Sequence, residues 1–203
     1  LYSTIPATDF RRKCFVDFAL DNEEKTNEEI INELALISDV PEQIYESVQK
    51  TNTEKFGGIQ LKFRPKNGEH VNQYAAWTVA IPMMRVEEMK LIEIEARGMQ
   101  NESEGIALLE AFGKTRDPQY TYGSHTKDAY YNYTTGGFRN EVWWQRRVEL
   151  WGEGFGMYDI KRLQKGIIRS YAGTNHVENY RWNVEQTPQW MVHCFVQTET
   201  NYN

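Results

Sequence analysis

The pattern of apolar and polar positions predicts a run of helices, and it is clearest in the segment 141–155. Apolar residues recur there every three or four positions, the spacing of one helical face, at Trp144, Val148, Trp151 and Phe155. Charged residues follow another face of the same expected helix, at Arg146, Glu149 and Glu153. We therefore expect one continuous helix through this segment, with its apolar stripe buried against neighbouring helices.

Two further segments predict a pair of helices joined by a short link. From residue 86 the apolar positions keep to one helical face, at Val86, Met89, Ile92, Ala96 and Met99. The segment 104–116 predicts a second helix with inward-facing apolar residues and Gly113 as its stop, the inward positions being Ile106, Leu109 and Phe112. Because the link is so short, the two helices are expected to pack antiparallel as a hairpin.

Shorter elements are expected in the first part of the chain. Helical spacing between Ile30 and Ile37, after a Thr26 cap, predicts a helix. Alternation of apolar and polar residues from Ile59 to Phe63 predicts a short strand.

The second half of the chain is expected to contain long irregular stretches. One or two helical turns are predicted at 157–167, and the tail from residue 172 is expected to be irregular. The segment 116–138 reads as a long loop with six aromatic rings. A loop of that length in a compact domain is usually functional or disordered, and its ring content argues against disorder.

The composition indicates a folded domain with surplus aromatic rings. Among 203 residues there are 12 tyrosines and 6 tryptophans, so many rings must lie near the surface. The 29 acidic residues outnumber the 23 basic ones, and the basic residues are scattered, which argues against a nucleic-acid partner. Cys14 and Cys194 are too few for a disulfide framework.

The sequence carries no pattern typical of catalysis, metal binding or cofactor binding. The histidines lack paired metal-ligand spacing, and they are His70, His125, His176 and His193. Glutamates crowd helix surfaces and do not suggest the two facing carboxylates that a glycosidase needs. Phosphate-binding loops, dinucleotide fingerprints and nucleophile elbows are missing from the sequence. We therefore expect no enzyme, no metal and no cofactor, and a glycan-active enzyme ranks third among the hypotheses.

Four motifs in order resemble the carboxy-terminal part of the SusD/RagB family. They are RVEEMKLIEIEA at 85–96, RDPQY at 116–120, RRVELWGEG at 146–154 and YDIKRL at 158–163. In the first motif the residues in the family's register are Arg85, Glu88, Leu91, Glu95 and Ala96. The resemblance is firm over 80–203; before that only DFRRK at 9–13 resembles a family feature, and FVQTETNYN at 195–203 resembles the family's ending. Departures fall at Glu87, Ile94, Gln145 and Gly156.

The resemblance implies a fold and a role. The fold would be mostly α, with helix hairpins of tetratricopeptide-like packing, long irregular loops and a little short strand, in a single domain over 1–203. Family members are cell-surface lipoproteins of the outer membrane in Bacteroidetes-type bacteria. They bind oligosaccharides or other nutrients and form a lid on a SusC-like, TonB-dependent transporter. The chain is then expected to be a fragment of a longer protein, with the lipid anchor that attaches it to the membrane absent from this chain.

The charged residues of the motifs are interpreted as structural. We expect a partly buried charge network that is costly to break but not reactive, formed by Arg146, Arg147, Glu149, Glu153, Asp159 and Arg162. Together with these, the family signature comprises Arg85, Glu88 and Glu95.

Sugar binding is the mechanism expected for the aromatic residues outside the core. Sugar rings stack their apolar faces on exposed aromatic rings, while neighbouring polar groups satisfy the hydroxyls. The ligand-binding residues proposed first are Tyr122, Tyr130, Tyr131, Tyr133, Asn132 and His125, and those proposed second are Trp77, Trp182 and Trp190. Two alternatives stay open: each ring, and His125 as well, could instead pack under a loop, and the whole chain could be a helical-repeat scaffold that binds protein without sugar affinity.

Overall fold

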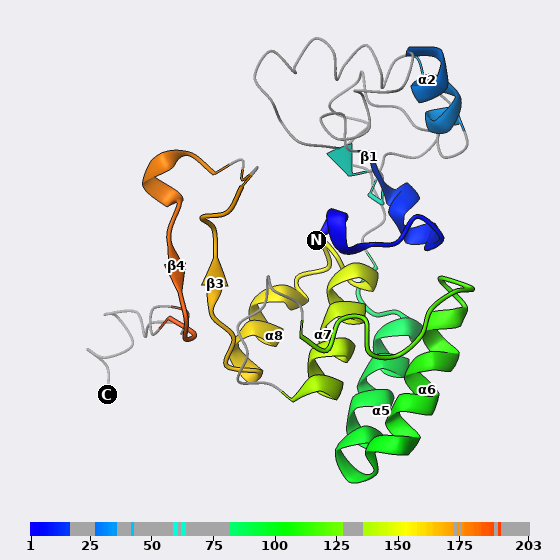
Figure 1. Ribbon diagram of the computed structural model, residues 1–203, viewed down its shortest axis with the longest axis vertical. Helices are drawn as coiled ribbons and strands as arrows, with labels where there is room; N and C mark the ends of the chain where they lie inside the picture. The colour runs from blue at the N-terminus through cyan, green and yellow to red at the C-terminus, as the bar shows by residue number, and fades with distance from the viewer. Residues whose placement is uncertain are drawn as a thin grey trace. The chain divides into compact units, whose positions relative to one another are not determined.

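The computed structural model describes residues 1–16, 27–35, 42, 59–60, 62–63, 82–127, 136–172, 174, 176–188 and 191. Over this part of the chain the protein is mostly helical with little strand, which confirms the expected α class (Figure 1). The chain forms two compact units, one of Leu1–Met89 with Glu110–Tyr120 and one of Lys90–Leu109 with Thr121–Asn203. Two helices, in the segments 86–100 and 102–114, contribute residues to both units. The single domain expected over 1–203 therefore stays a prediction.

The first unit opens with two 3₁₀ helices, η1 (Tyr2–Thr4) and η2 (Phe10–Cys14). Asp9 caps η2 by accepting the backbone N–H of Arg11 at 2.9 Å, and its carboxylate also pairs with the Arg11 guanidinium at 2.6 Å. Both side chains are buried, so the DFRRK segment is held by its own ion pair.

The predicted strand and helix of the first unit are present in shorter form. Strand β1 (Phe15–Val16) pairs antiparallel with β2 (Ile59–Gln60), whereas the alternation had predicted a strand as far as Phe63. Helix α2 (Asn27–Ala35) confirms the expected helix. Its predicted cap, Thr26, lies outside the described residues.

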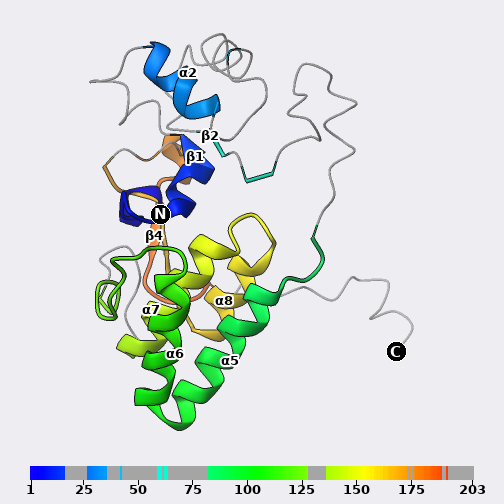
Figure 2. The ribbon, with the colours of Figure 1, turned by 90° about the vertical axis from the view of Figure 1, so that its right-hand side faces the viewer.

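Helices α5 (Val86–Gln100) and α6 (Glu102–Lys114) confirm the predicted hairpin, and they run back along each other in both ribbon views (Figures 1 and 2). Asn101 begins α6 by accepting the backbone N–H of Glu104 on its side-chain oxygen. The helices meet closely at two glycines, since a Cβ on Gly105 would overlap the backbone of Gly98. A Cβ on Gly98 would in turn overlap the ring of Phe138.

The buried face of α5 is not the face that the sequence pattern indicates. Leu91, Ile94 and Gly98 are buried, whereas the expected stripe points outward. Its exposed members include Val86, Met89, Ile92 and Met99, at 66%, 49%, 43% and 61% exposure. The expectation of a buried stripe was therefore wrong. Helix α5 carries apolar residues on two faces, and the close contact of Gly98 with Gly105, which we call the glycine junction, buries the face that contains Leu91 and Ile94.

Gly113 does not stop α6, which continues to Lys114. It is buried, and a Cβ there would overlap the ring of Tyr120. The glycine is thus needed for the close approach of this ring, and the prediction of a helix stop was wrong. The inward positions Leu109 and Phe112 are confirmed as core.

The continuous helix expected through Phe155 is divided into α7 (Gly137–Glu149) and α8 (Phe155–Arg162). Between them the backbone turns at Gly152 and Gly154, whose φ angles are +77° and +89°, a region that favours glycine. Trp144 and Val148 are buried on α7 as predicted, but Trp151 and Phe155 are half-buried and do not extend its stripe. Helix α8 confirms the helical turns expected from residue 157.

The tail is more regular than predicted. Strand β3 (Ile167–Ile168) pairs antiparallel with β4 (Asn183–Val184), with Ile167 opposite Val184. A 3₁₀ turn, η5 (Glu178–Tyr180), lies within the excursion between them. These strands were missed because two-residue strands leave almost no alternation to detect.

Candidate functional site

Helix α7 is buried on nearly all sides although its sequence is rich in charge. Ten of its side chains are buried, among them the ionisable residues Glu141, Arg146 and Glu149. Buried charges are stable only when paired and hydrogen-bonded. The contacts of these groups therefore decide whether the motif charges are structural or available for chemistry.

Arg146 and Asp159 form the centre of the buried charge network. Arg146 Nε donates to both carboxylate oxygens of Asp159, at 2.8 and 3.1 Å, and this links α7 to α8. Asp159 also accepts from Arg162 Nε at 2.7 Å. The side chains of Arg146 and Asp159 are 7% and 3% exposed, so solvent screens the pair little.

Glu95 extends the network to α5. It accepts from Arg162 at 2.6 Å and from Arg139 at 3.4 Å. Although burial opposes the effect, the bonds and attraction to Glu95 and Asp159 raise the pKa of Arg162 above its ordinary value. The expected pairing of Arg146 and Arg162 with Asp159 is confirmed, whereas Glu95 and Arg139 are members of the network that the sequence did not predict.

The other signature residues lie in different surroundings. Arg85 is half-buried and pairs with Glu87 at 3.3 Å. Glu88 and Glu153 are half-buried and Glu149 is buried. Arg147 extends its guanidinium over the ring of Trp143, with 4.9 Å between its central carbon and the ring centroid.

A second buried polar group joins His125 to α7. The His125 ring stacks on Trp144 at 3.7 Å between centroids, and its backbone N–H donates to Glu141 at 2.8 Å. Asn140 donates to the His125 carbonyl at 2.5 Å. Of the two interpretations of His125, packing is the one that these contacts support, because the side chain is 8% exposed.

Lys165 completes this group from the segment after α8. Its side chain is fully buried, and Nζ donates to Asn140 Oδ1 at 2.6 Å while lying 4.6 Å from the Trp143 ring centroid. Burial, together with repulsion from Arg139 and Arg147, lowers the pKa of Lys165 from 10.5 to about 8. The ammonium and the Arg147 guanidinium therefore both contact the Trp143 ring, as cation–π neighbours.

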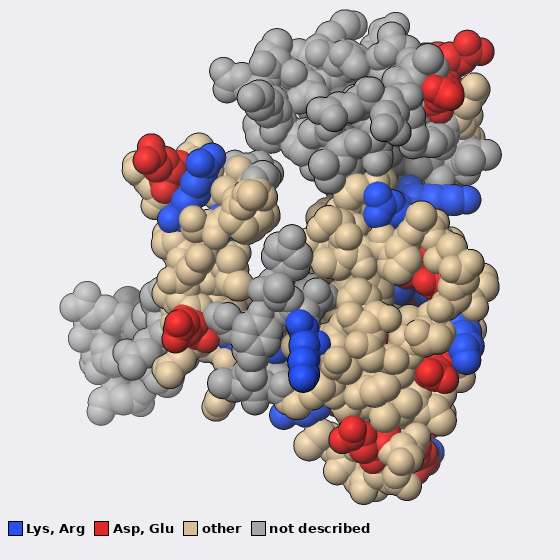
Figure 3. All heavy atoms as spheres, in the orientation of Figure 1, with Lys and Arg blue, Asp and Glu red and all other residues tan. Residues whose placement is uncertain are grey.

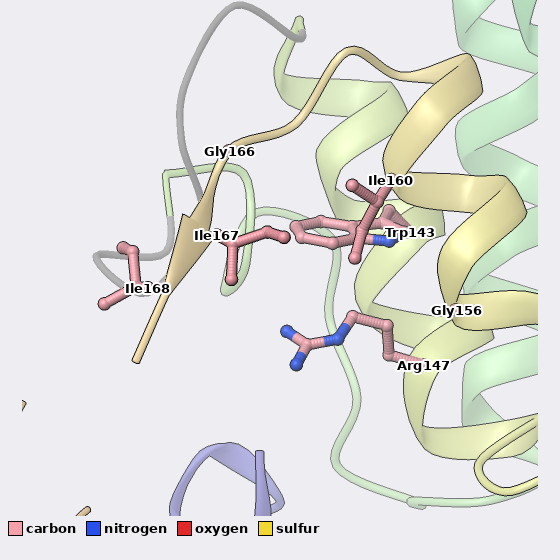
Figure 4. Close-up of a pocket in the computed structure, with 7 residues that line it drawn as sticks. All are labelled: Trp143, Arg147, Gly156, Ile160, Gly166, Ile167 and Ile168. Atoms are coloured by element: carbon pink, nitrogen blue, oxygen red, sulfur yellow. The ribbon is translucent and has the colours of Figure 1, made fainter. Parts of the chain in front are cut away.

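A pocket of about 240 Å³ opens beside this ring, between α7, α8 and β3 (Figure 4). Its lining consists of Trp143, Arg147, Gly156, Ile160, Gly166, Ile167 and Ile168. In Figure 4 the indole reaches toward Ile167 and the guanidinium of Arg147 points into the open space. One weak signal for this pocket is present in the sequence. Two adjacent tryptophans on a helix point about 100° apart, so Trp143 and Trp144 cannot share one stripe.

The hairpin of β3 and β4 carries aromatic rings outside the core. The Arg169 guanidinium lies 4.5 Å from the centroid of the Trp182 ring, and the Arg169 N–H donates to the Trp182 carbonyl at 3.1 Å. Tyr171 and Tyr180, in the excursion beyond the strands, are 46% and 58% exposed. We call Arg169, Tyr171, Tyr180 and Trp182 the hairpin surface.

The proposed ligand residues other than His125 fall in three places. Trp182 belongs to the hairpin surface and is half-buried. Tyr122 is half-buried, and burial together with Glu102 and Glu141 raises its pKa above the ordinary value. The others lie outside the described residues, namely Tyr130, Tyr131, Tyr133, Asn132, Trp77 and Trp190. The hairpin residues Arg169, Tyr171 and Tyr180 were missed, because nothing in their local sequence distinguishes them from loop.

On the face drawn in Figure 3, the described residues carry side chains of both charge signs. Acidic and basic side chains interleave over α5 and α6 on the face drawn in Figure 3. Within the described ranges, His, Cys, Asp and Glu side chains form no group of three that could hold a metal ion. The helices in those ranges are all too short or too polar to cross a membrane.

Comparisons with protein families, characterised proteins and solved structures returned no match.

Proposed function

We propose that this protein is part of a surface nutrient-binding lipoprotein of the SusD/RagB kind, which captures oligosaccharide and delivers it to a TonB-dependent transporter in the outer membrane. It would act by binding alone, without catalysis. Its helix hairpin would belong to a tetratricopeptide-like array.

The observation that carries the proposal is the meeting of separate motifs in one network. Glu95 comes from the first motif, Arg146 from the third and Asp159 from the fourth, and all three side chains are linked through arginines. Motifs that resemble a family by chance have no reason to converge on one ion cluster. This convergence supports a shared folding signature, and it leaves the ligand to groups outside the network.

The hairpin surface is the described region best suited to sugar. Tyr171 and Tyr180 are both exposed aromatic residues, and the Arg169 guanidinium carries donors suited to hydroxyl groups. Asn183 stiffens its base, because its side-chain oxygen accepts from the backbone N–H groups of Arg169 and Ser170 at 3.0 and 2.9 Å. A rigid base keeps the rings in place without an ordering cost on binding.

A glycan array probed with the chain tests sugar binding directly. Tyr171→Ala and Tyr180→Ala should each weaken retention on the positive glycans by about tenfold, as expected when a stacking ring is lost. Tyr158→Ala is the matched control, since Tyr158 is as exposed as Tyr180 but lies on α8. If Tyr171→Ala, Tyr180→Ala and Tyr158→Ala are retained equally on the positive glycans, the hairpin surface is not the sugar-binding site. Failure to bind any glycan would remove the proposal of sugar capture.

The proposed transporter partner needs its own experiment. The proposed lipoprotein that contains this chain can be affinity-purified from outer membranes. It should be recovered together with an equal amount of a large β-barrel protein. Recovery of this lipoprotein without such a barrel would contradict the lid role, whatever the ligand.

One observation favours the scaffold hypothesis instead. The outward stripe of α5 exposes Val86, Met89, Ile92 and Met99 on a single helix, and contiguous apolar surface often marks a protein contact. A helical scaffold would bind protein through it and ignore sugar. The glycan array separates the two functions, because a scaffold would give no positive glycan.

A further inference from the structure

The pocket beside Trp143 has a composition that does not suit a neutral sugar. Three isoleucine side chains and the indole form its apolar walls, and two glycines contribute backbone. Among its described lining residues, Arg147 is the only charged side chain and none is a neutral hydrogen-bonding residue apart from the indole. Sugar hydroxyls placed against the three isoleucines would lose water and gain few partners, which is unfavourable.

The charges around the pocket favour an anion. Arg147 reaches into it, and the buried ammonium of Lys165 lies on the same indole ring. After burial, the nearby charges of Arg139 and Arg147 contribute to the lowered pKa of Lys165, so three cationic side chains lie close to this ring. No carboxylate lies among the described residues that line the cavity.

We infer that this pocket binds a small organic carboxylate with a branched apolar body. The carboxylate would meet the planar guanidinium of Arg147, which can donate two parallel N–H bonds to it. The apolar body would lie against Ile160, Ile167 and Ile168. The volume of 240 Å³ corresponds to about eight waters of liquid, so a ligand of about eight non-hydrogen atoms fits.

Gly156 allows a test that removes none of the existing groups. It lines the pocket, and a Cβ added there would meet nothing within 4 Å. A Cβ at this position therefore fits without a clash. Gly156→Gln and Gly156→Glu are equal in size and differ in charge, so their difference reports the preference for an anion.

Calorimetric titration with 4-methylpentanoate and its uncharged amide tests the inference. The acid should bind about tenfold tighter than the amide. Arg147→Gln should abolish that difference and Arg147→Lys should keep part of it. Gly156→Glu should bind the acid at least fivefold more weakly than Gly156→Gln, while the two bind the amide equally.

N-acetyl-leucine and its amide distinguish the source of the carboxylate. If N-acetyl-leucine binds as well as 4-methylpentanoate, the site accepts a peptide carboxyl terminus. If it binds more weakly, the site is for a free acid. Either result supports the inference. Equal binding of acid and amide, or no binding of either, would overturn it. An unchanged preference for the acid in both Arg147→Gln and Gly156→Glu would also overturn the inference. If Arg147→Gln does not fold, the comparison of Gly156→Gln with Gly156→Glu decides alone.

Discussion

Helices α7 and α5 reverse what their sequences suggest. Helix α7 contains the charged motif and yet is buried on nearly every side, with Arg146 and Glu149 inside. Helix α5 contains the cleaner apolar stripe and yet exposes it, with Met89 and Ile92 outside. Burial of a helix face therefore follows from what can pair or approach closely, and apolar content alone does not decide it.

The largest expected effect comes from breaking the network that holds α7. Asp159→Asn would leave the buried Arg146 guanidinium without its counter-ion, which should lower the free energy of unfolding by about 3 to 5 kcal/mol. Urea denaturation measures it. Arg97→Met is the matched control, because Arg97 pairs with Glu93 and Glu104 on the exposed side of α5. If Asp159→Asn lowers the free energy of unfolding no more than Arg97→Met does, the contrast between the buried charges of α7 and the exposed charges of α5 is contradicted.

The next effect concerns the buried Lys165 beneath α7. Its folded pKa of about 8 lies below the ordinary 10.5, so between these values the unfolded chain holds a proton that the folded protein has lost. The free energy of unfolding should then rise with pH across this window, by on the order of 3 kcal/mol in total. Lys165→Met should lack this rise, and other titrating groups cancel in the difference. If the free energies of unfolding of the natural protein and Lys165→Met differ by a constant amount from about pH 7 to pH 10, the lowered pKa of Lys165 is contradicted.

A smaller effect tests the glycine junction that orients α5. Gly98→Ala should lower the free energy of unfolding by about 1 to 3 kcal/mol, because the new methyl group overlaps the Phe138 ring. Ile92→Gln, on the outward face of the same helix, should change it by less than about 0.5 kcal/mol. Thermal or urea unfolding of both variants decides. Equal losses would mean that the outward face is packed.

The sequence predicted which segments are helical better than which faces they bury. Helical spacing located α5, α6 and α7, because a period near 3.6 persists over several turns. It failed at the end of α7, where Gly152 and Gly154 outweigh the continuing apolar spacing. It also misplaced the core face of α5, because two apolar faces on one helix look alike until Gly98 meets Phe138.

The candidate sites were less predictable than the helices. Arg146, Asp159 and Arg162 were expected to form a network and do so. Arg147, from the same motif, also lines the pocket, which was not predicted, because adjacent residues on a helix point in different directions. The pairing of Arg169 with Trp182 depends on the register of two short strands, and that register is not encoded in any local pattern.

Native-state hydrogen exchange tests the contrast between the two helices most directly. Amides of α7 from Val142 to Glu149 should exchange only when their unit unfolds, with free energies of opening above those of α5 between Val86 and Met99. The account predicts this order because the charges of α7 are buried and paired while one face of α5 is open to solvent. Exchange of α7 by local opening, at a lower free energy than α5, would contradict it.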